Sequence, residues 1–315
     1  MATQTVFRWT KRGSYDGLQE FKEPIPSAGS YELLVKVRSV SLNYRDVAIA
    51  NMTYPYPIKD DVVPCCDMAG EVAQVGDHVE GFSVGDAVVL ATSTAALYGP
   101  VKGLLHSLGG PVDGTLREYM VVPAHTAIKL PKSSHSFDQW AALVGTGSTM
   151  WNTFYAYAPL KPGQSVLLQG TGGVSLTALI FAKAAGATTI ITSSSDDKLE
   201  YVKANLGVDY TINYKTHPDW AAEVQRITNG EGVDHVIENG GAGTIKQSIA
   251  SVAYGGVVSV IGFLAANVPQ DKMPDVAMEA LNKGCVVRGI LAGSKQQLEE
   301  ATRHSASTGT RSSRV

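Results

Sequence analysis

The chain has 315 residues, of which 44% are hydrophobic and 17% charged, and its formal net charge is −3. This composition excludes a disordered chain, which combines low hydrophobicity with high net charge. It also lacks the excess of lysine and arginine that marks a general nucleic-acid binder. At about 150 residues per domain, the length predicts two domains.

Targeting signals and disulfides are not expected. The first residues lack an apolar segment of signal-peptide length, and the longest mostly apolar stretch, 255–268, is shorter than the ~20 residues of a membrane-spanning helix. Cys65, Cys66 and Cys285 do not form the spacing of a disulfide framework. We therefore expect a cytoplasmic protein that binds neither membranes nor nucleic acid.

The first third of the chain has the pattern of a β-rich domain. Short runs at 33–40, 71–75 and 86–90 are rich in valine and leucine and are separated by Gly-Asp turns. Such runs predict a small barrel or sandwich. The segment 91–114 has a weaker pattern and more glycine and serine, which predicts a loop with a helical turn.

The pattern changes near Ser136 to helices that alternate with strands. After a helix at 137–160, strands are expected at 165–170, 188–192, 210–214, 235–238 and 256–262, with helices at 176–185, 198–205, 220–228 and 245–252. This alternation predicts an α/β fold with a doubly wound parallel sheet, whose ligands bind at the carboxyl ends of the strands. Beyond a helix at 296–304, the Ser/Thr/Arg-rich end is expected to be disordered.

A glycine-rich turn lies where the first of these strands meets its helix. Its residues are Gly170, Thr171, Gly172, Gly173, Val174 and Ser175. A helix that begins there presents free N–H groups to a pyrophosphate, and in this strand-turn-helix context the motif predicts a dinucleotide site. Ser175 replaces the usual third glycine and is small enough to keep helix and strand close. The alternative is an incidental turn.

The end of the second strand indicates which dinucleotide the site would bind. An NAD site has Asp or Glu about 20 residues beyond the glycines, to hold the ribose hydroxyls. Ser193 and Ser194 occupy that point here, with Lys198 and Tyr214 nearby. Hydroxyls and a lysine suit a 2′-phosphate, so NADP(H) is favoured. Alternatively the serines only cap the next helix, and both roles are compatible.

Five stretches of the chain together match one known family, namely 41–46, 69–72, 84–86, 169–175 and 211–214. In them the chain resembles the medium-chain dehydrogenase/reductase superfamily, in particular its zinc-type alcohol dehydrogenase-like and quinone oxidoreductase branch. The resemblance implies a GroES-like β-barrel catalytic domain over 1–135 and a Rossmann NADP(H)-binding domain over 136–293, with the active site in the cleft between them. It also implies that relatives continue for some tens of residues where this chain has 294–315, a helix and a tail.

The resemblance also implies that zinc is absent. Zinc-dependent members hold the metal with Cys, His and Cys, and these positions fall on Asn43, Cys66 and Gly145. One thiol beside Asp67 cannot form the three-ligand site of a catalytic zinc. Cys65 and Cys66 are then either a reactive or metal-binding pair or, as favoured here, small apolar packing. Three histidines are expected to be structural or on the surface: His78, His125 and His235.

Without zinc, hydrogen-bond donors must polarise the substrate oxygen. The candidates that the resemblance implies are Asn43, Tyr44, Arg45 and Tyr54. For the two tyrosines, aromatic packing of a loop is an equal alternative. The resemblance further implies that nicotinamide is contacted by Thr149, Gly240, Gly262 and Phe263.

Together these observations predict an NADP(H)-dependent oxidoreductase that transfers hydride between nicotinamide and a small carbonyl, alcohol, enone or quinone, of the kind used in biosynthetic pathways. One alternative is an NADPH-binding protein with little activity because of its shortened end. Another is a zinc-dependent alcohol dehydrogenase. The resemblance also implies a homodimer, because relatives pair the sheet edge formed by the strand-like run 285–290 with its copy in a second subunit.

Overall fold

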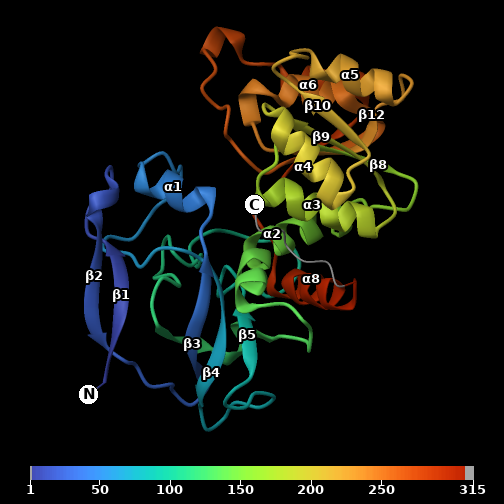
Figure 1. Cartoon of the computed structure of the whole chain (residues 1–315). Coiled ribbons are helices and arrows are strands. Elements are labelled where there is room, and N and C mark those ends of the chain that lie inside the picture. The colour runs from blue at the N-terminus through green and yellow to red at the C-terminus, as the bar shows by residue number, and fades with distance from the viewer. Residues whose placement is uncertain (1, 309–315) are drawn as a thin grey trace. The chain divides into compact units, whose positions relative to one another are not determined.

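The computed structural model describes residues 2–308, which divide into two compact units (Figure 1). Unit 1 comprises residues up to Trp151 together with the segment that begins at Ala292, and unit 2 runs from Asn152 to Leu291. Unit 1 therefore extends beyond the predicted first domain, because it includes 136–151 and the last helix. The division falls inside one helix, α2 (Phe137–Tyr155).

Unit 1 contains a five-stranded antiparallel sheet of order β6-β3-β4-β5-β7 and a separate hairpin of β1 and β2. The strands are β1 (Thr3–Trp9), β2 (Leu18–Pro24), β3 (Glu32–Ser41), β4 (Asp67–Val75), β5 (Ala87–Leu90), β6 (Tyr119–Pro123) and β7 (Ala127–Lys129). The helical segments are η1 (Tyr15–Gly17), α1 (Tyr44–Ala50), η2 (Ala124–Thr126), part of α2, and α8 (Lys295–Thr308). Ser41 at the end of β3 pairs with Asp67 at the start of β4, so the candidate residues after Ser41 begin beside Asp67.

The sheet of unit 1 buries the alternating side chains of its central strands. This core consists of Leu33, Val35, Met68, Val72, Val88, Leu90, Met120, Val122 and Ala127. A second cluster, which contains Trp9, Ile49, Ala50 and Val62, fixes α1 against β1. Burial of such side chains stabilises each by about 1.5–3 kcal/mol, so α1 has a firm base.

The segment 91–114 differs from the prediction. It contains bends, turns and the isolated bridges Ser93↔Ser107 and Leu108↔Val112, but no helical turn. These bridges give backbone N–H and C=O groups of the segment hydrogen-bond partners within the segment itself, in place of those that a helical turn would provide.

Unit 2 confirms the predicted doubly wound parallel sheet, whose order is β10-β9-β8-β11-β12-β13. The strands are β8 (Ser165–Gln169), β9 (Thr188–Ser193), β10 (Tyr210–Asn213), β11 (Val233–Glu238), β12 (Val252–Val260) and β13 (Val286–Gly289). The helical segments are α3 (Gly173–Ala184), α4 (Asp196–Leu206), α5 (Trp220–Ile227), η3 (Gly241–Gly243), α6 (Ile245–Ser251), η4 (Gln270–Lys272) and α7 (Val276–Lys283). Helix α2 ends at Tyr155, earlier than predicted, and Pro159 follows within one turn.

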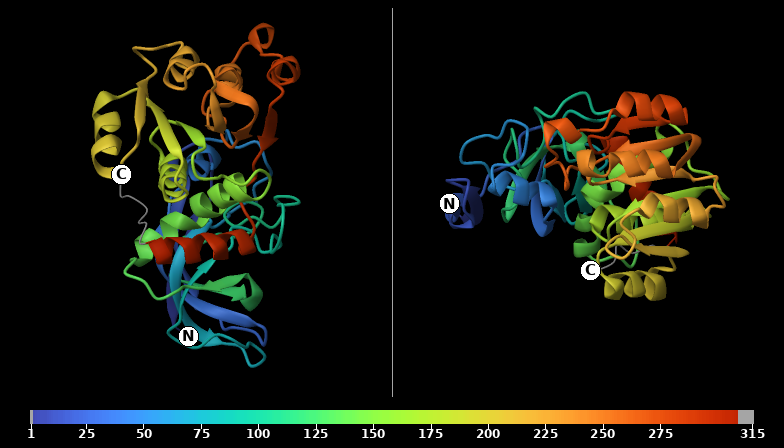
Figure 2. Two further views of the ribbon diagram at one scale, coloured as in Figure 1. Left: turned by 90° about the vertical axis from the view of Figure 1, so that its right-hand side faces the viewer. Right: turned by 90° about the horizontal axis from the view of Figure 1, so that it is seen from above.

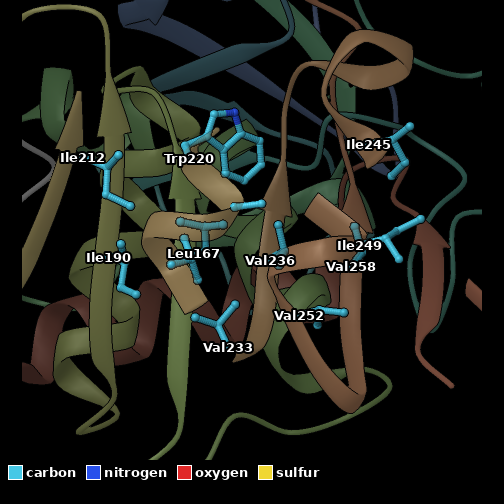
Figure 3. Close-up of a cluster of buried hydrophobic side chains, with 12 residues drawn as sticks. Leu167, Ile190, Ile212, Trp220, Val233, Val236, Ile245, Ile249, Val252 and Val258 are labelled. Atoms are coloured by element: carbon cyan, nitrogen blue, oxygen red, sulfur yellow. The ribbon is translucent and has the colours of Figure 1, made fainter. Parts of the chain in front are cut away.

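One face of this sheet packs against α5 and α6. Figure 3 shows alternate residues of the strands, such as Leu167, Ile190 and Val236, directed toward Trp220 of α5 and Ile249 of α6. The intervening strand residues point to the opposite face, since successive side chains alternate across a sheet. Helices therefore cover both faces of the parallel sheet (Figures 1 and 2).

Helix α8 is longer than predicted and is part of unit 1. Figure 2 shows it, in red, alongside the green helix α2. The indole Nε1 of Trp151 donates to Glu300 Oε2 over 2.6 Å, and Leu298 and Ala301 are buried. Residues 305–308, which were predicted to be disordered, thus belong to α8, and the rest of the predicted tail, 309–315, lies outside the described residues. No helix within 2–308 is both long and apolar enough to cross a membrane.

Candidate active site

The glycine-rich turn of unit 2 has the geometry that a dinucleotide needs. Gly170 has φ +74°, which is accessible mainly to glycine, and it turns the chain from β8 into α3. A Cβ added to Gly170 or Gly172 would meet no atom within 4 Å, so a ligand can approach the backbone closely. Val174 lies in the first turn of α3, whose N-terminus starts at Gly173. The N–H groups of this turn can therefore receive a pyrophosphate.

Ser175 joins three segments at this turn. Its hydroxyl donates to Gln169 O over 2.7 Å and accepts from Asn239 Nδ2 over 3.0 Å. The serine that replaces the third glycine thus fastens α3 to the ends of both β8 and β11.

The end of β9 has no carboxylate, as the sequence shows, and its serines have local partners. Ser193 is buried, and its hydroxyl accepts from Ser195 N over 3.3 Å. Ser195 caps α4 by accepting from Lys198 N, so the expected capping role is present. Tyr214 N donates to Ser193 O over 3.0 Å, which places this exposed tyrosine beside the serines. Ser194 is partly exposed and the Lys198 side chain is exposed.

The predicted nicotinamide residues of unit 2 belong to two loops that follow β11 and β12. These loops are joined by backbone hydrogen bonds from Leu264 N to Asn239 O, at 3.1 Å, and from Ala265 N to Gly240 O, at 2.7 Å. A Cβ on Gly262 would lie 2.4 Å from Asn239 O, so glycine is required there by the close approach of the two loops. Phe263 is partly buried within the second loop.

In unit 1 the three positions assigned to zinc ligands surround one buried carboxylate, Asp67. Its Oδ2 accepts from Asn43 Nδ2 over 3.0 Å and from Gly145 N over 2.9 Å, and its Oδ1 accepts from the Cys66 thiol over 3.1 Å. Asp67 is fully buried, and this burial raises its pKa above the ordinary value. Asp46 Oδ2 accepts from Asn43 N over 2.8 Å, which fixes the start of α1.

These residues do not fit a catalytic zinc. Gly145 has no side chain, and a Cβ there would lie 2.7 Å from Asp67 Oδ2. Burial raises the pKa of the Cys66 thiol, which favours the protonated form over the thiolate that zinc requires. Within residues 2–308 no group of three His, Cys, Asp or Glu side chains has the arrangement of a metal site. Cys65 is buried as well, and burial also raises its pKa, in keeping with the packing interpretation.

Arg45 and Tyr54 form a second polar group next to this carboxylate. Arg45 Nη1 donates to Leu108 O over 2.7 Å, and its Nε donates to the Tyr54 hydroxyl over 3.3 Å. The guanidinium carbon also lies 5.3 Å from the centre of the Tyr54 ring. Because the Tyr54 oxygen accepts this bond, its own proton is available for another acceptor. Tyr44, by contrast, is 55% exposed.

The other predicted residues are placed separately. Thr149 lies in α2, where its hydroxyl donates to Gly145 O over 2.6 Å. His235 is buried in β11, while His78 and His125 are exposed and line a pocket of about 600 Å³ in unit 1 that contains none of the predicted site residues.

Comparison with known proteins agrees with this architecture. Residues 29–132 match the family model of the alcohol dehydrogenase GroES-like domain, and 173–307 match that of the zinc-binding dehydrogenases. A zinc-type alcohol dehydrogenase-like protein of Schizosaccharomyces pombe is 46% identical over 267 residues, which are 84% of this chain and 77% of the relative. The chain belongs to the medium-chain dehydrogenase/reductase superfamily.

Two solved structures of the superfamily share the whole fold. One, a candidate alcohol dehydrogenase of Sinorhizobium meliloti 1021, is 33% identical with a TM-score of 0.88, and the match covers 99% of this chain and 91% of that one. Another, an NAD-dependent alcohol dehydrogenase, is 30% identical with a TM-score of 0.85, over 98% and 90% of the two chains. The predicted family, the Rossmann-like sheet and the GroES-like domain are confirmed, and the chain falls in an oxidoreductase class.

Two buried residues, Asp67 of unit 1 and Glu238 of unit 2, were not among the predicted site residues. Asp67 was noted only as a neighbour of Cys66, and Glu238 only as the end of a strand. Both are fully buried carboxyl groups. A signal for Glu238 was present, because an acidic residue that ends an apolar strand must find several donors if it is buried.

Proposed function

We propose that the protein is a zinc-independent, NADP(H)-dependent oxidoreductase that transfers hydride between nicotinamide and the carbon of a small carbonyl, alcohol, enone or quinone. The observation that carries the proposal is the glycine turn between β8 and α3, which is open to a ligand, together with a β9 that ends in Ser193 instead of a carboxylate. The cofactor supplies the hydride chemistry, and the protein supplies binding and polarisation.

Three groups of residues would hold the dinucleotide. The turn from Gly170 to Val174 would bind the pyrophosphate through its N–H groups. The 2′-phosphate would lie by the end of β9, where the binding residues are Ser193, Ser194, Lys198 and Tyr214. The nicotinamide half would be contacted, as the family resemblance implies, by Thr149, Gly240, Gly262 and Phe263.

The substrate oxygen would receive its hydrogen bond from Tyr54. Arg45 Nε already donates to the Tyr54 oxygen, which makes the tyrosine proton a better donor to charge that develops on the substrate. Asn43 and Arg45 would act mainly by holding this arrangement, since their side chains bind Asp67 and Leu108. Tyr44 would border the substrate from the exposed side of α1.

Cofactor preference tests the first part of the proposal. Titration of protein fluorescence should show tighter binding of NADPH than of NADH. Ser193→Asp should weaken NADPH by about tenfold or more, because its charge repels the 2′-phosphate, whereas Ser193→Ala should have a much smaller effect. Equal affinities of the unchanged protein for the two dinucleotides would contradict NADP(H) specificity.

Tyr54→Phe tests the second part. In a screen of aldehydes, enones and quinones with NADPH, this variant should turn over on the order of a hundredfold more slowly, with nearly unchanged NADPH affinity. Tyr56→Phe is the matched control, since the Tyr56 ring packs 5.4 Å from that of Tyr54. NADPH binding without turnover of any compound would instead favour a binding protein.

Three further features belong to the same proposal. Metal analysis of the purified protein should find no stoichiometric zinc, and one zinc per chain would favour a zinc-dependent alcohol dehydrogenase. The sheet edge at β13 is proposed to form a homodimer, which sedimentation can measure. A cytoplasmic location is proposed because Cys65, Cys66 and Cys285 are free thiols.

A further inference from the structure

Glu238 ends β11 and is fully buried, yet among the described residues it forms no ion pair with a lysine or arginine. Burial of a carboxylate is costly unless hydrogen bonds replace its water. Because no cation balances its charge, the carboxylate must be surrounded by several hydrogen-bond donors.

Five donors converge on this carboxyl group. Oε1 accepts from Gly240 N at 2.7 Å, Gly241 N at 2.8 Å and Thr244 Oγ1 at 2.5 Å. Oε2 accepts from Gln169 Nε2 at 2.8 Å and from the Ser248 hydroxyl. The loop 239–244 is therefore wrapped around the side chain of the residue that precedes it.

The same network extends to two neighbouring segments. Gln169 Oε1 accepts from Asn239 N over 2.9 Å, so the ends of β8 and β11 are bridged in both directions. The backbone carbonyl of Glu238 accepts from Ile261 N over 2.9 Å, at the start of the loop after β12. One residue thus holds the chain ends of three adjacent strands.

Its place in the sheet indicates what the network is for. In the order β10-β9-β8-β11-β12-β13, the chain first adds strands on one side of β8 and then, from β11 on, adds them on its other side. Ligands of such sheets bind at this switch point between β8 and β11. If the pyrophosphate lies on α3 and the adenosine half extends toward Ser193 and Tyr214, the other half of the dinucleotide extends over the loops after β11 and β12.

We infer that Glu238 is a positioning residue that holds the 239–244 loop and the adjoining 261–265 loop in the shape on which the nicotinamide half of the cofactor rests. This inference depends on the proposed dinucleotide site. Because the N–H groups of Gly240 and Gly241 are directed to the carboxylate, the loop offers the cofactor a fixed surface.

The test compares two ligands and two carboxylates. Glu238→Gln retains the size of the side chain but replaces an acceptor by a donor that faces other donors. NADPH should bind about tenfold more weakly to this variant. Adenosine 2′,5′-bisphosphate, which lacks the nicotinamide half, should bind within about twofold of the unchanged protein.

Asp234→Asn is the matched control. Asp234 lies at the amino end of the same strand, where it accepts from Ser165 N over 2.8 Å and likewise ties β11 to β8. Its replacement should leave both affinities within about twofold, although it removes a comparable charge-assisted hydrogen bond.

Thr244→Val is a second variant that removes a single donor and should show the same selective effect, smaller in size. In ligand-free protein, Glu238→Gln should also speed amide hydrogen exchange in 239–244 while that of β9 is unchanged. Unchanged NADPH affinity, or equal loss for both ligands, would overturn the inference. If the unchanged protein binds neither NADPH nor NADH, the dinucleotide proposal itself is wrong, and the assignment to nicotinamide falls with it.

Discussion

Each of the two units contains one carboxyl group that is fully buried, Asp67 in unit 1 and Glu238 in unit 2. The donors to Asp67 come from three separate segments, at Asn43, Cys66 and Gly145. Three of the five donors to Glu238 come from the loop that directly follows it. The first carboxyl group therefore joins distant parts of a unit, whereas the second shapes one loop. The difference shows that similar burial can connect distant segments in one unit and order a single loop in the other, the loop on which we propose that the cofactor rests.

Removal of Asp67 should have the largest effect on stability. Asp67→Ala removes the shared acceptor of three donors, which are the buried Cys66 thiol and groups of the half-buried residues Asn43 and Gly145. We expect a loss of about 3 kcal/mol or more in the unfolding free energy of unit 1, measured by denaturant titration. Glu238→Ala should cost unit 2 less, because the 239–244 loop can rearrange toward solvent.

Asp86→Asn is the control for unit 1. This carboxylate forms a solvent-accessible pair with Lys129 at 2.7 Å, and such pairs contribute about 1 kcal/mol or less. A loss for Asp67→Ala no larger than that of Asp86→Asn would show that the buried carboxyl group does not hold unit 1 together.

Gly145→Ala sharpens the same point. In a helix interior this change usually stabilises by about 1 kcal/mol. Here the added Cβ would lie 2.7 Å from Asp67 Oδ2, so we expect a net destabilisation of about 1–3 kcal/mol, seen as a lower thermal midpoint. A stabilised variant would mean that the Asp67 side chain can move to make room for the added methyl group.

The smallest effect concerns pH and the strand that carries Glu238. His235 of β11 is buried against Phe154, and burial lowers its pKa from the ordinary 6.5. Below pH 6.5, His235 therefore binds a proton more readily in the unfolded chain than in the folded chain. The folded state has its full stability above this pH and becomes less stable as the pH falls further.

Hydrogen exchange in β11, corrected for intrinsic exchange rates, should show a lower local stability at pH 5 than at pH 7.5. His235→Phe should remove that dependence. Burial also lowers the pKa of His304, which lies in α8 of unit 1, so the pH response of exchange in α8 should persist in His235→Phe. If exchange in β11 keeps its pH response in His235→Phe, the response is due to groups other than His235.

The sequence predicted unit 2 well because its signals are local. Each strand and helix there has its own periodicity, and the turn after β8 is visible as a run of glycines, of which Gly170 has the positive φ that favours glycine. The hairpin of β1 and β2 was missed, because charged residues such as Arg8, Glu20 and Lys22 interrupt the apolar alternation and because β2 is largely solvent-exposed. Strand pairing satisfies the backbone of this hairpin without a full apolar face.

The candidate site was only partly predictable for a related reason. The positions of Asn43, Cys66 and Gly145 followed from the family resemblance, but their common contact with Asp67 depends on residues 24 and 78 positions away from it in sequence. In the same way, Gln169 is 69 residues from Glu238. No local pattern records which donors a fold brings to a buried carboxyl group.

The discontinuity of unit 1 has a consequence for how the protein is made. Unit 2 is a single stretch from Asn152 to Leu291, so every strand of its sheet has been translated before α8. Unit 1 must wait for α8, whose Lys295 N and Gln296 N donate to the carbonyls of Ala96 and Leu97. On a ribosome that adds about 5–20 residues each second, unit 2 can fold first, and unit 1, although its translation begins earlier, is completed last. A nascent chain that stops before Lys295 would therefore contain a folded unit 2 that follows a unit 1 still without α8.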